Sequence, residues 1–170
     1  MFRKLAFLVL LFLPLLGKSQ DSAIYSFGAD LNYHPQDFFF RVRGQLMKKN
    51  LSHEVFIGFG ITKTIFQKQG NPNIGYDLSY RFKLNDWFSI SPIIRLSYSL
   101  LNTKVPEKHR LIHTTESFAA FRMMVGNRNR FAVTGGIGPA IEWKYDAYLG
   151  RKNRFFMWNY FAEISYYYEF

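Results

Sequence analysis

Large apolar residues alternate with small or polar ones along most of the chain after residue 20. In the clearest run, Ile74, Tyr76 and Leu78 alternate with Gly75 and Asp77. A period of two residues is typical of β-strands that have one apolar and one polar face. No stretch shows a convincing period of 3.6 residues, which an amphipathic helix would need. The pattern therefore predicts an all-β protein.

Eight segments carry this alternation, and turn-forming residues separate most of them. They cover approximately residues 25–34, 38–46, 54–62, 74–84, 88–99, 119–125, 131–145 and 155–170. The sixth segment is the weakest, and the stretch before it is expected to form an outer loop. Pro92 and Pro139 fall on the apolar face inside two segments. Because proline removes a backbone donor from the strand ladder, a bulge or bend is expected at each.

The volume of the apolar side chains indicates which face of the strands points inward. An eight-stranded barrel encloses just enough space for side chains to fill. The apolar face supplies about five bulky residues per segment, many of them aromatic, and this volume does not fit inside. We therefore expect the apolar face to contact lipid, in strands of about 9 to 11 residues that cross a bilayer at a tilt. The sheet is expected to close, because an open edge would leave backbone groups unpaired in hydrocarbon.

The first twenty residues predict export from the cytoplasm. Arg3 and Lys4 precede an apolar run that ends at Leu16, and the small residues Gly17 and Ser19 follow. This order is typical of a secretory signal peptide that is cleaved behind Ser19, and the run is shorter than the roughly 20 residues of a membrane-spanning helix. The predicted organisation is a signal peptide at residues 1–19 and one barrel domain at residues 20–170.

Composition and charge exclude several classes of function. The chain has a formal net charge of +10, from 22 basic and 12 acidic residues. Three of the basic residues lie in the predicted signal peptide, so that 19 basic and 12 acidic residues remain, a net charge of +7. These charges are scattered among aromatic residues instead of forming a basic stripe, so nucleic acid is not an expected partner. Cysteine is absent, which excludes disulfides, thiolate metal sites and a lipidated cysteine anchor.

The signal peptide, the eight alternating segments and an aromatic final strand together resemble the small eight-stranded outer-membrane barrels, such as the OmpA transmembrane domain and OmpX. The resemblance covers residues 20–170. It implies an all-β, eight-stranded, antiparallel up-and-down transmembrane β-barrel in the outer membrane of a Gram-negative-type bacterium. It also implies that the barrel-assembly machinery recognises Tyr166, Tyr168 and Phe170. Both termini and the links near residues 48–52, 85–86 and 126–129 would then be periplasmic.

Charged residues on the polar face predict an ion network that plugs the lumen. Seven bases and six acids share this face. Near-balance favours cross-strand pairing, because a buried charge is costly unless it is matched and hydrogen-bonded. The predicted members are Asp30, Arg41, Arg43, Glu54, Asp77, Arg81, Arg95, Arg122, Glu142, Lys144 and Glu163. A charge-selective pore would show one dominant sign, but a small conducting channel stays open as an alternative.

Basic residues in the expected outer loops predict a basic rim near the outer headgroups. The candidates for contacts with phosphates of outer-leaflet glycolipid are Lys104, Lys108, Arg110, Arg151, Lys152 and Arg154. Asp37 and Glu116 are among the fewer acidic residues assigned to the same loops. A solvated loop set without a specific ligand is the simpler alternative.

No catalytic site, cofactor or metal centre is predicted. His109 and His113 have the spacing of a helical metal site, but Pro106 and the neighbouring strands disfavour a helix there. The sequence predicts a structural or interaction component that contacts membrane lipid, glycolipid and the barrel-assembly machinery. Other outer-membrane proteins are candidate partners in a larger complex. A glycolipid-modifying enzyme and a soluble lipocalin-like carrier are the alternatives.

Overall fold

The computed structural model of the chain describes residues 23–67, 69–105, 108–146 and 150–170, without the side chains at 66, 103–105, 108–110, 146 and 151. The predicted signal peptide lies outside these residues. The elements are β1 (Ile24–His34), β2 (Asp37–Lys48), β3 (Leu51–Gly60), the π-helix η2 (Thr62–Phe66), β4 (Pro72–Tyr80), β5 (Phe82–Lys83), β6 (Phe88–Val105), β7 (Lys108–Val125), β8 (Asn129–Asp146) and β9 (Arg151–Glu169). In the described part of the chain, no helix has both the length and the apolar character to cross a bilayer.

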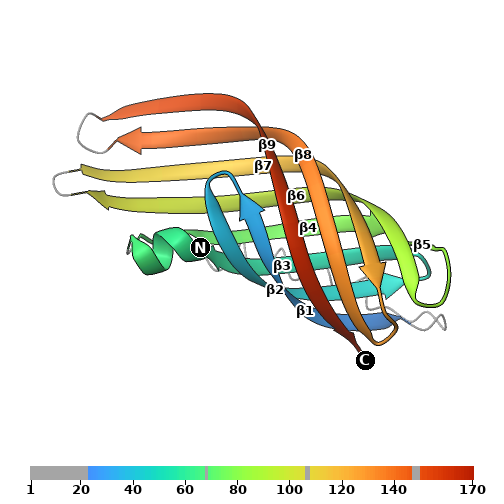
Figure 1. Ribbon diagram of the computed structural model, residues 1–170. Helices are drawn as coiled ribbons and strands as arrows, with labels where there is room; N and C mark the ends of the chain where they lie inside the picture. Colours follow the sequence, from blue (N-terminus) through green and yellow to red (C-terminus); the bar gives the residue numbers. More distant parts are fainter. Residues whose placement is uncertain (1–22, 68, 106–107, 147–149) are drawn as a thin grey trace.

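The strands form one closed antiparallel sheet (Figure 1). Strands that are neighbours in the chain pair with each other, and β1 also pairs with β9. Both β4 and β5 pair with β6. The last pair of β4 joins Ser79 to Ile93 and the first pair of β5 joins Phe82 to Ile90, so both strands advance by three residues between the two pairs. The two short strands are therefore one strand that is interrupted at Arg81. The predicted eight-stranded, antiparallel, up-and-down barrel is confirmed for the described residues.

The prolines interrupt pairing without the expected bulge. The gap between β4 and β5 lies beside Pro92, while on the other edge Pro92 keeps its register with Phe121. On β8, Gly138 and Pro139 do not pair with β7. The register is the same on both sides of this gap, where Ile137 pairs with Ala119 and Ala140 pairs with Glu116. A bulge would insert a residue in one strand. Here the missing N–H removes ladder bonds and leaves the register intact, so neither proline forms a bulge. The alternative expectation, a local bend, stays a prediction.

The barrel is apolar outside and polar inside, as the volume of the apolar side chains predicts. Ile94 and Ile164 on the outward face are 62% and 65% exposed. On the inward face Arg95 is 1% exposed and Asp77 is fully buried. Soluble proteins place these residue types the other way round, because burying apolar surface drives their folding. This distribution is expected for a chain whose outer surface lies in an apolar environment.

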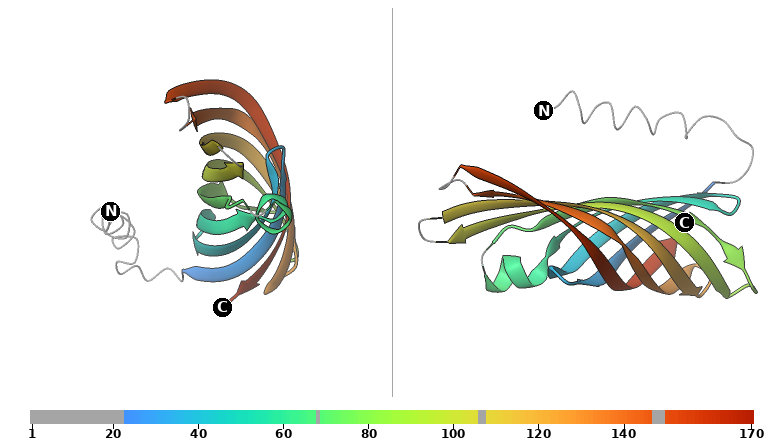
Figure 2. Two further views of the ribbon diagram at one scale, coloured as in Figure 1. Left: turned by 90° about the vertical axis from the view of Figure 1, so that its left-hand side faces the viewer. Right: turned by 90° about the horizontal axis from the view of Figure 1, so that it is seen from above.

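The two ends of the barrel differ in height. The turn end carries the short links at residues 49–50, 84–87 and 126–128, and the loop end carries the links at 35–36, 61–71, 106–107 and 147–150. Strands β1 to β4 have 9 to 12 residues, whereas β6 to β9 have 18 or 19. The surplus length projects beyond the loop end (Figures 1 and 2). We call residues 100–105, 108–113, 143–146 and 151–154 the tall wall.

The expected outer loop before the sixth segment is therefore strand. Leu100 pairs with His113, and the β6–β7 register runs on to Val105 and Lys108. Apolar and polar residues do not alternate regularly here, because neither face of these strands has to be buried. Backbone pairing between neighbouring strands maintains them instead. The link at residues 61–71 is attached to this wall, since the Asn102 N–H donates to the Gly70 carbonyl at 2.9 Å.

Candidate functional site

The middle of the lumen is filled by eight charged side chains from seven strands, which we call the mid-lumen network. Its members are Asp30, Arg41, Arg43, Glu54, Asp77, Arg95, Arg122 and Glu163. None is more than 3% exposed. The closed sheet positions them, because alternate residues of each strand point to the same axis.

Glu163 on β9 pairs with three of the four arginines of the mid-lumen network. Its carboxylate bonds Arg41 of β2, lies 2.6 Å from the Arg43 guanidinium and accepts a 2.8 Å bond from Arg95 of β6. Arg95 also donates two bonds of 2.7 Å to both carboxylate oxygens of Asp77. Such bidentate pairs fix geometry as well as charge. Glu163 therefore links strands on opposite sides of the barrel.

Glu54 on β3 is the second acid that several groups share. Arg122 of β7 donates to it at 2.9 Å, and Arg43 bonds its other oxygen. The buried Tyr167 hydroxyl donates to the same carboxylate at 3.1 Å. The remaining ring strand, β8, contributes Thr134, whose hydroxyl accepts a 3.2 Å bond from Arg122. All eight strands of the ring thus take part.

Aromatic rings complete the packing around the guanidinium groups. The Phe56 ring lies 4.4 Å from the Arg41 guanidinium carbon, and the Phe161 ring lies 4.1 Å from that of Arg95. A cation over a ring face is attracted by the ring quadrupole, more strongly where water is excluded. The sequence pattern did not assign these rings a role. The only signal for them was their position among the inward residues.

Four guanidinium groups and four carboxylates make the mid-lumen network neutral in formal charge. A neutral lattice of paired charges leaves no excess sign to select an ion. Breaking it would leave a buried charge without its partner, which is strongly destabilising. The arrangement can hold the strands in register and close the lumen.

The loop-end mouth has a separate polar cluster. Glu116 lies 2.8 Å from the His34 ring nitrogen and accepts bonds from Asn159 at 2.7 Å and Ser97 at 3.0 Å. Its expected place in an outer loop is wrong, because β7 extends past it and turns it inward. Asp37, also expected in a loop, is buried at the start of β2 and accepts a 3.0 Å bond from the Thr62 N–H at η2.

Three predicted lumen residues lie apart from the mid-lumen network. Glu142 accepts a 3.1 Å bond from Gln36 at the loop-end mouth, and Lys144 pairs with Glu142 at 2.7 Å. The Lys144 side chain is 44% exposed, so it belongs to the mouth and not to the buried lumen. Arg81 lies at the opposite end, and its guanidinium contacts the Met124 sulfur at 3.7 Å.

The turn-end mouth encloses a cavity of about 210 Å³. Arg81 and Arg130 line it together with the turns at residues 84–87 and 126–128. Arg130 donates a 2.6 Å bond to the Asn127 carbonyl and pairs with Glu169. Sequence reasoning missed Arg130, because it stands at the edge of its strand beside a turn. Its only signal is the inward parity that it shares with Ala132 and Thr134.

The outward face of β9 carries the described part of the predicted basic rim. Lys152 and Arg154 are exposed, and the Arg154 guanidinium lies 5.9 Å from the Trp143 ring. The side chains of Lys104, Lys108, Arg110 and Arg151 lie outside those that the structure describes. In the backbone register, Asp146 stands between Arg110 and Arg151, so an acidic residue separates two of the predicted cations.

The predicted assembly signal lies on the outward face at the turn end. Tyr166 and Tyr168 are about 40% exposed, and Phe170 is 81% exposed. Tyr166 donates a 2.7 Å bond to the Asn129 side chain of β8. Tyr166 and Tyr168 lie where β9 pairs with both β8 and β1, so they mark the seam at which β9 and β1 close the barrel.

The two histidines of the tall wall stand on an extended strand. Positions 109 and 113 of β7 are therefore about 13 Å apart along the chain, too far to share one metal ion. His113 instead lies 2.6 Å from the Tyr98 hydroxyl. Among the described residues, no group of three or more histidine, aspartate or glutamate side chains has metal-binding geometry.

Comparison with known proteins gives structural neighbours only. No family model and no curated protein matches the sequence. The N-terminal β-barrel domain of OprF from Pseudomonas aeruginosa is similar in fold, with a TM-score of 0.62 and 9% identity over 90% of this chain and all of that one. A major outer membrane protein from Thermus thermophilus gives a TM-score of 0.57 and 11% identity over 88% of this chain and all of that one. The chain therefore has the fold of the eight-stranded outer-membrane barrels.

Proposed function

We propose that the chain is an integral outer-membrane β-barrel with a plugged lumen, which acts as a structural or interaction component. The neutral mid-lumen network is the observation that carries this proposal. It occupies the bore with paired charges, and the outward face is covered with large apolar side chains. The fold neighbours from two outer membranes support the location.

Conductance measurements test the plug. Purified protein in planar bilayers is expected to give no ion current, because the paired side chains of the mid-lumen network should block the bore. A variant that combines Arg95→Ala with Asp77→Ala would remove one bidentate pair from the bore and is expected to give small openings. Regular current steps from the wild-type chain would contradict the plug and favour a small channel.

The tall wall supports an interaction role. Strands β1 to β4 already have the length that a bilayer requires, so the surplus of β6 to β9 presents surface beyond it. We propose that a second outer-membrane protein binds this surface. A photo-crosslinking residue at Tyr145, which is 37% exposed on the tall wall, should capture protein. The matched control is Phe38 of β2, one of the shorter strands, which is 38% exposed and should capture lipid only. Equal capture at both positions would contradict the proposal.

The exposed pair Lys152 and Arg154 supports contact with glycolipid phosphates. A surface charge contributes roughly 1 kcal/mol to binding an anionic surface, so Lys152→Gln with Arg154→Gln should weaken binding about tenfold or more. The control is Lys48→Gln, an exposed lysine at the turn end outside the turn-end cavity, which should leave binding unchanged. Glycolipid without phosphate should bind all three proteins equally. The same preparation tests for a glycolipid-modifying activity, and turnover would contradict the non-catalytic role proposed here.

A further inference from the structure

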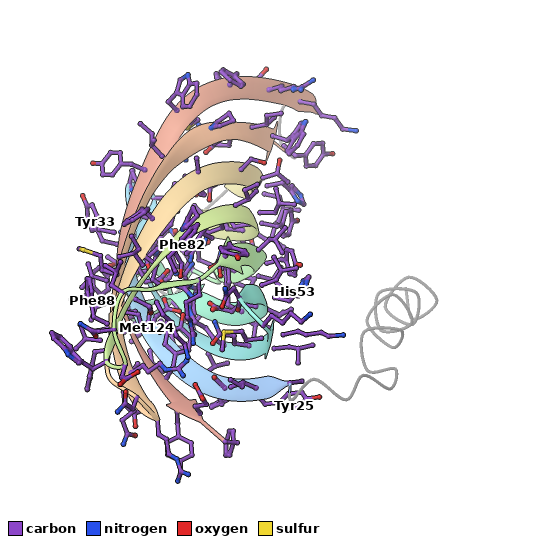
Figure 3. The ribbon with its side chains drawn as sticks, turned by 90° about the vertical axis from the view of Figure 1, so that its right-hand side faces the viewer. Tyr25, Tyr33, His53, Phe82, Phe88 and Met124 are labelled. Carbon is purple, nitrogen blue, oxygen red and sulfur yellow. The ribbon has the colours of Figure 1, made fainter. Side chains whose placement is uncertain are left out.

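The turn-end mouth contains a buried arginine that forms no ion pair with an acid in the described part of the chain. Arg81 is 4% exposed, and its one hydrogen-bond partner among the described residues is the sulfur of Met124, a weak acceptor. Met124 is labelled in Figure 3. In the described part of the chain, no carboxylate oxygen lies within 4.0 Å of its guanidinium. The buried arginines of the mid-lumen network each have at least two acids. Burial of a charge without a partner is costly, so Arg81 requires another explanation.

A second arginine in the same cavity is only partly satisfied. Arg130 is 8% exposed, and its Nη1 atom is buried without a hydrogen-bond partner. Its other donors reach the Asn127 carbonyl and Glu169. The two guanidinium groups therefore present free donors to one space of about 210 Å³.

The charge around this space is positive. Four basic residues line it (Arg81, Lys83, Arg128 and Arg130), against two acids (Asp86 and Glu169). Arginine donors in a fixed planar fork match the oxygen atoms of phosphate. A cavity of this size is below the range of drug-sized ligands and admits a small oxyanion.

We propose that the turn-end mouth is a binding site for a phosphate group, held by Arg81 and Arg130. The phosphate is either free in solution or part of a lipid headgroup that enters past the exposed Trp87 at the rim. The existence of this site does not depend on the proposed function. Only the assignment of the site to the periplasm rests on the proposed function. Its bound anion would supply the counter-charge that Arg81 lacks.

Thermal unfolding in an alkyl glycoside detergent tests the site, because the detergent carries no phosphate. Inorganic phosphate at constant ionic strength should raise the Tm of the wild-type chain progressively, as expected for a ligand that binds the folded state. The Arg81→Met variant retains the packing against Met124, and its apparent affinity for phosphate should fall at least tenfold. Lys48→Gln, at an exposed lysine of the turn end that does not line the cavity, is the matched control and should respond like the wild type.

The arms of the experiment separate the outcomes. A response to inorganic phosphate supports a free anion, and a response only to added phosphatidylglycerol supports a headgroup. An equal rise of Tm with chloride shows an adventitious ion only and overturns the proposal. Equal responses of wild type and Arg81→Met, or no response to either phosphate source, also overturn it. A plugged, membrane-inserted barrel with no phosphate response would leave the proposed function intact, so the two failures are distinguishable.

Discussion

Arg95 and Arg81 are both arginines on the inward face, and both are almost fully buried. Arg95 in the middle of the lumen bonds Asp77 twice and Glu163 once, and the Phe161 ring lies against it. Among the residues that the structure describes, the one hydrogen-bond partner of Arg81 at the turn end is a thioether sulfur. The same residue type on the same face therefore serves two purposes. In the middle it closes a neutral lattice, and at the end it carries an uncompensated charge.

This difference teaches that burial alone does not define a structural ion pair in a small barrel. Mid-lumen arginines are tied to acids on other strands, so they fix the relative position of those strands. A turn-end arginine without such ties contributes little to register. Its cost to folding is offset only if an anion from outside the chain binds it.

The largest effect is expected at Glu163, because three arginines lie within 2.8 Å of its carboxylate. Glu163→Gln should lower the free energy of unfolding by about 3 to 5 kcal/mol, as removal of one partner of a buried ion pair does. Urea unfolding in lipid vesicles, followed by tryptophan fluorescence, measures it. Glu169→Gln on the same face of the same strand is the control. It should cost less than about 1 kcal/mol, because Glu169 is partly exposed and bonds one arginine.

Replacing each arginine by methionine compares the two regions directly. Arg95→Met leaves Asp77 and Glu163 short of a partner and should destabilise the barrel by about 3 kcal/mol. Arg81→Met leaves no acid unpaired, and in phosphate-free detergent it should be neutral or stabilising. A similar loss of stability in both variants would show that the two arginines are equivalent and would break the comparison.

A double-mutant cycle on Arg95 and Asp77 should give a coupling free energy of about 1 to 3 kcal/mol, the range for residues in one network. Arg95→Met, Asp77→Asn and the double variant are unfolded under identical conditions. A coupling near zero would mean that the bidentate pair observed here adds nothing beyond packing.

The smallest effect is expected for the turn-end pair Arg130 and Glu169. A cycle with Arg130→Gln and Glu169→Gln should give a coupling below about 1 kcal/mol, because Glu169 is partly exposed and water at the mouth screens the pair. The same cycle in about 1 M salt should give still less. A coupling as large as that of Arg95 and Asp77 would place the turn end in the same class as the mid-lumen network.

The period-two pattern was sufficient to predict the class of fold and the two faces of the sheet. The signal is strong because a shift of one residue would reverse every side chain, as at Ile94 and Arg95. The pattern failed between residues 100 and 118, where neighbouring strands hold the backbone and neither face is consistently apolar. In this region the length of each strand depends on hydrogen bonds to the neighbouring strand. The residues of a single segment do not predict these bonds.

The candidate site was only partly predictable. Eight of the eleven predicted lumen residues lie in the mid-lumen network, because inward parity already groups them. Their pairing was not predictable, since Glu54 of β3 meets Arg122 of β7 across the bore and not along a strand ladder. Arg81, Glu142 and Lys144 share the same parity but stand at the ends. Height along the barrel axis depends on the stagger of all the strands, which a single sequence does not give.

The central claim is that the apolar outward face of the strands contacts acyl chains. Because the chain has no cysteine, a nitroxide label can be attached to a single introduced one. With labels at Ile94→Cys and Ile164→Cys in lipid vesicles, power-saturation EPR should show strong access to oxygen and weak access to an aqueous nickel complex. Lys152→Cys at the loop end should show the opposite. Nickel access at Ile94 and Ile164 equal to that at Lys152 would contradict the claim.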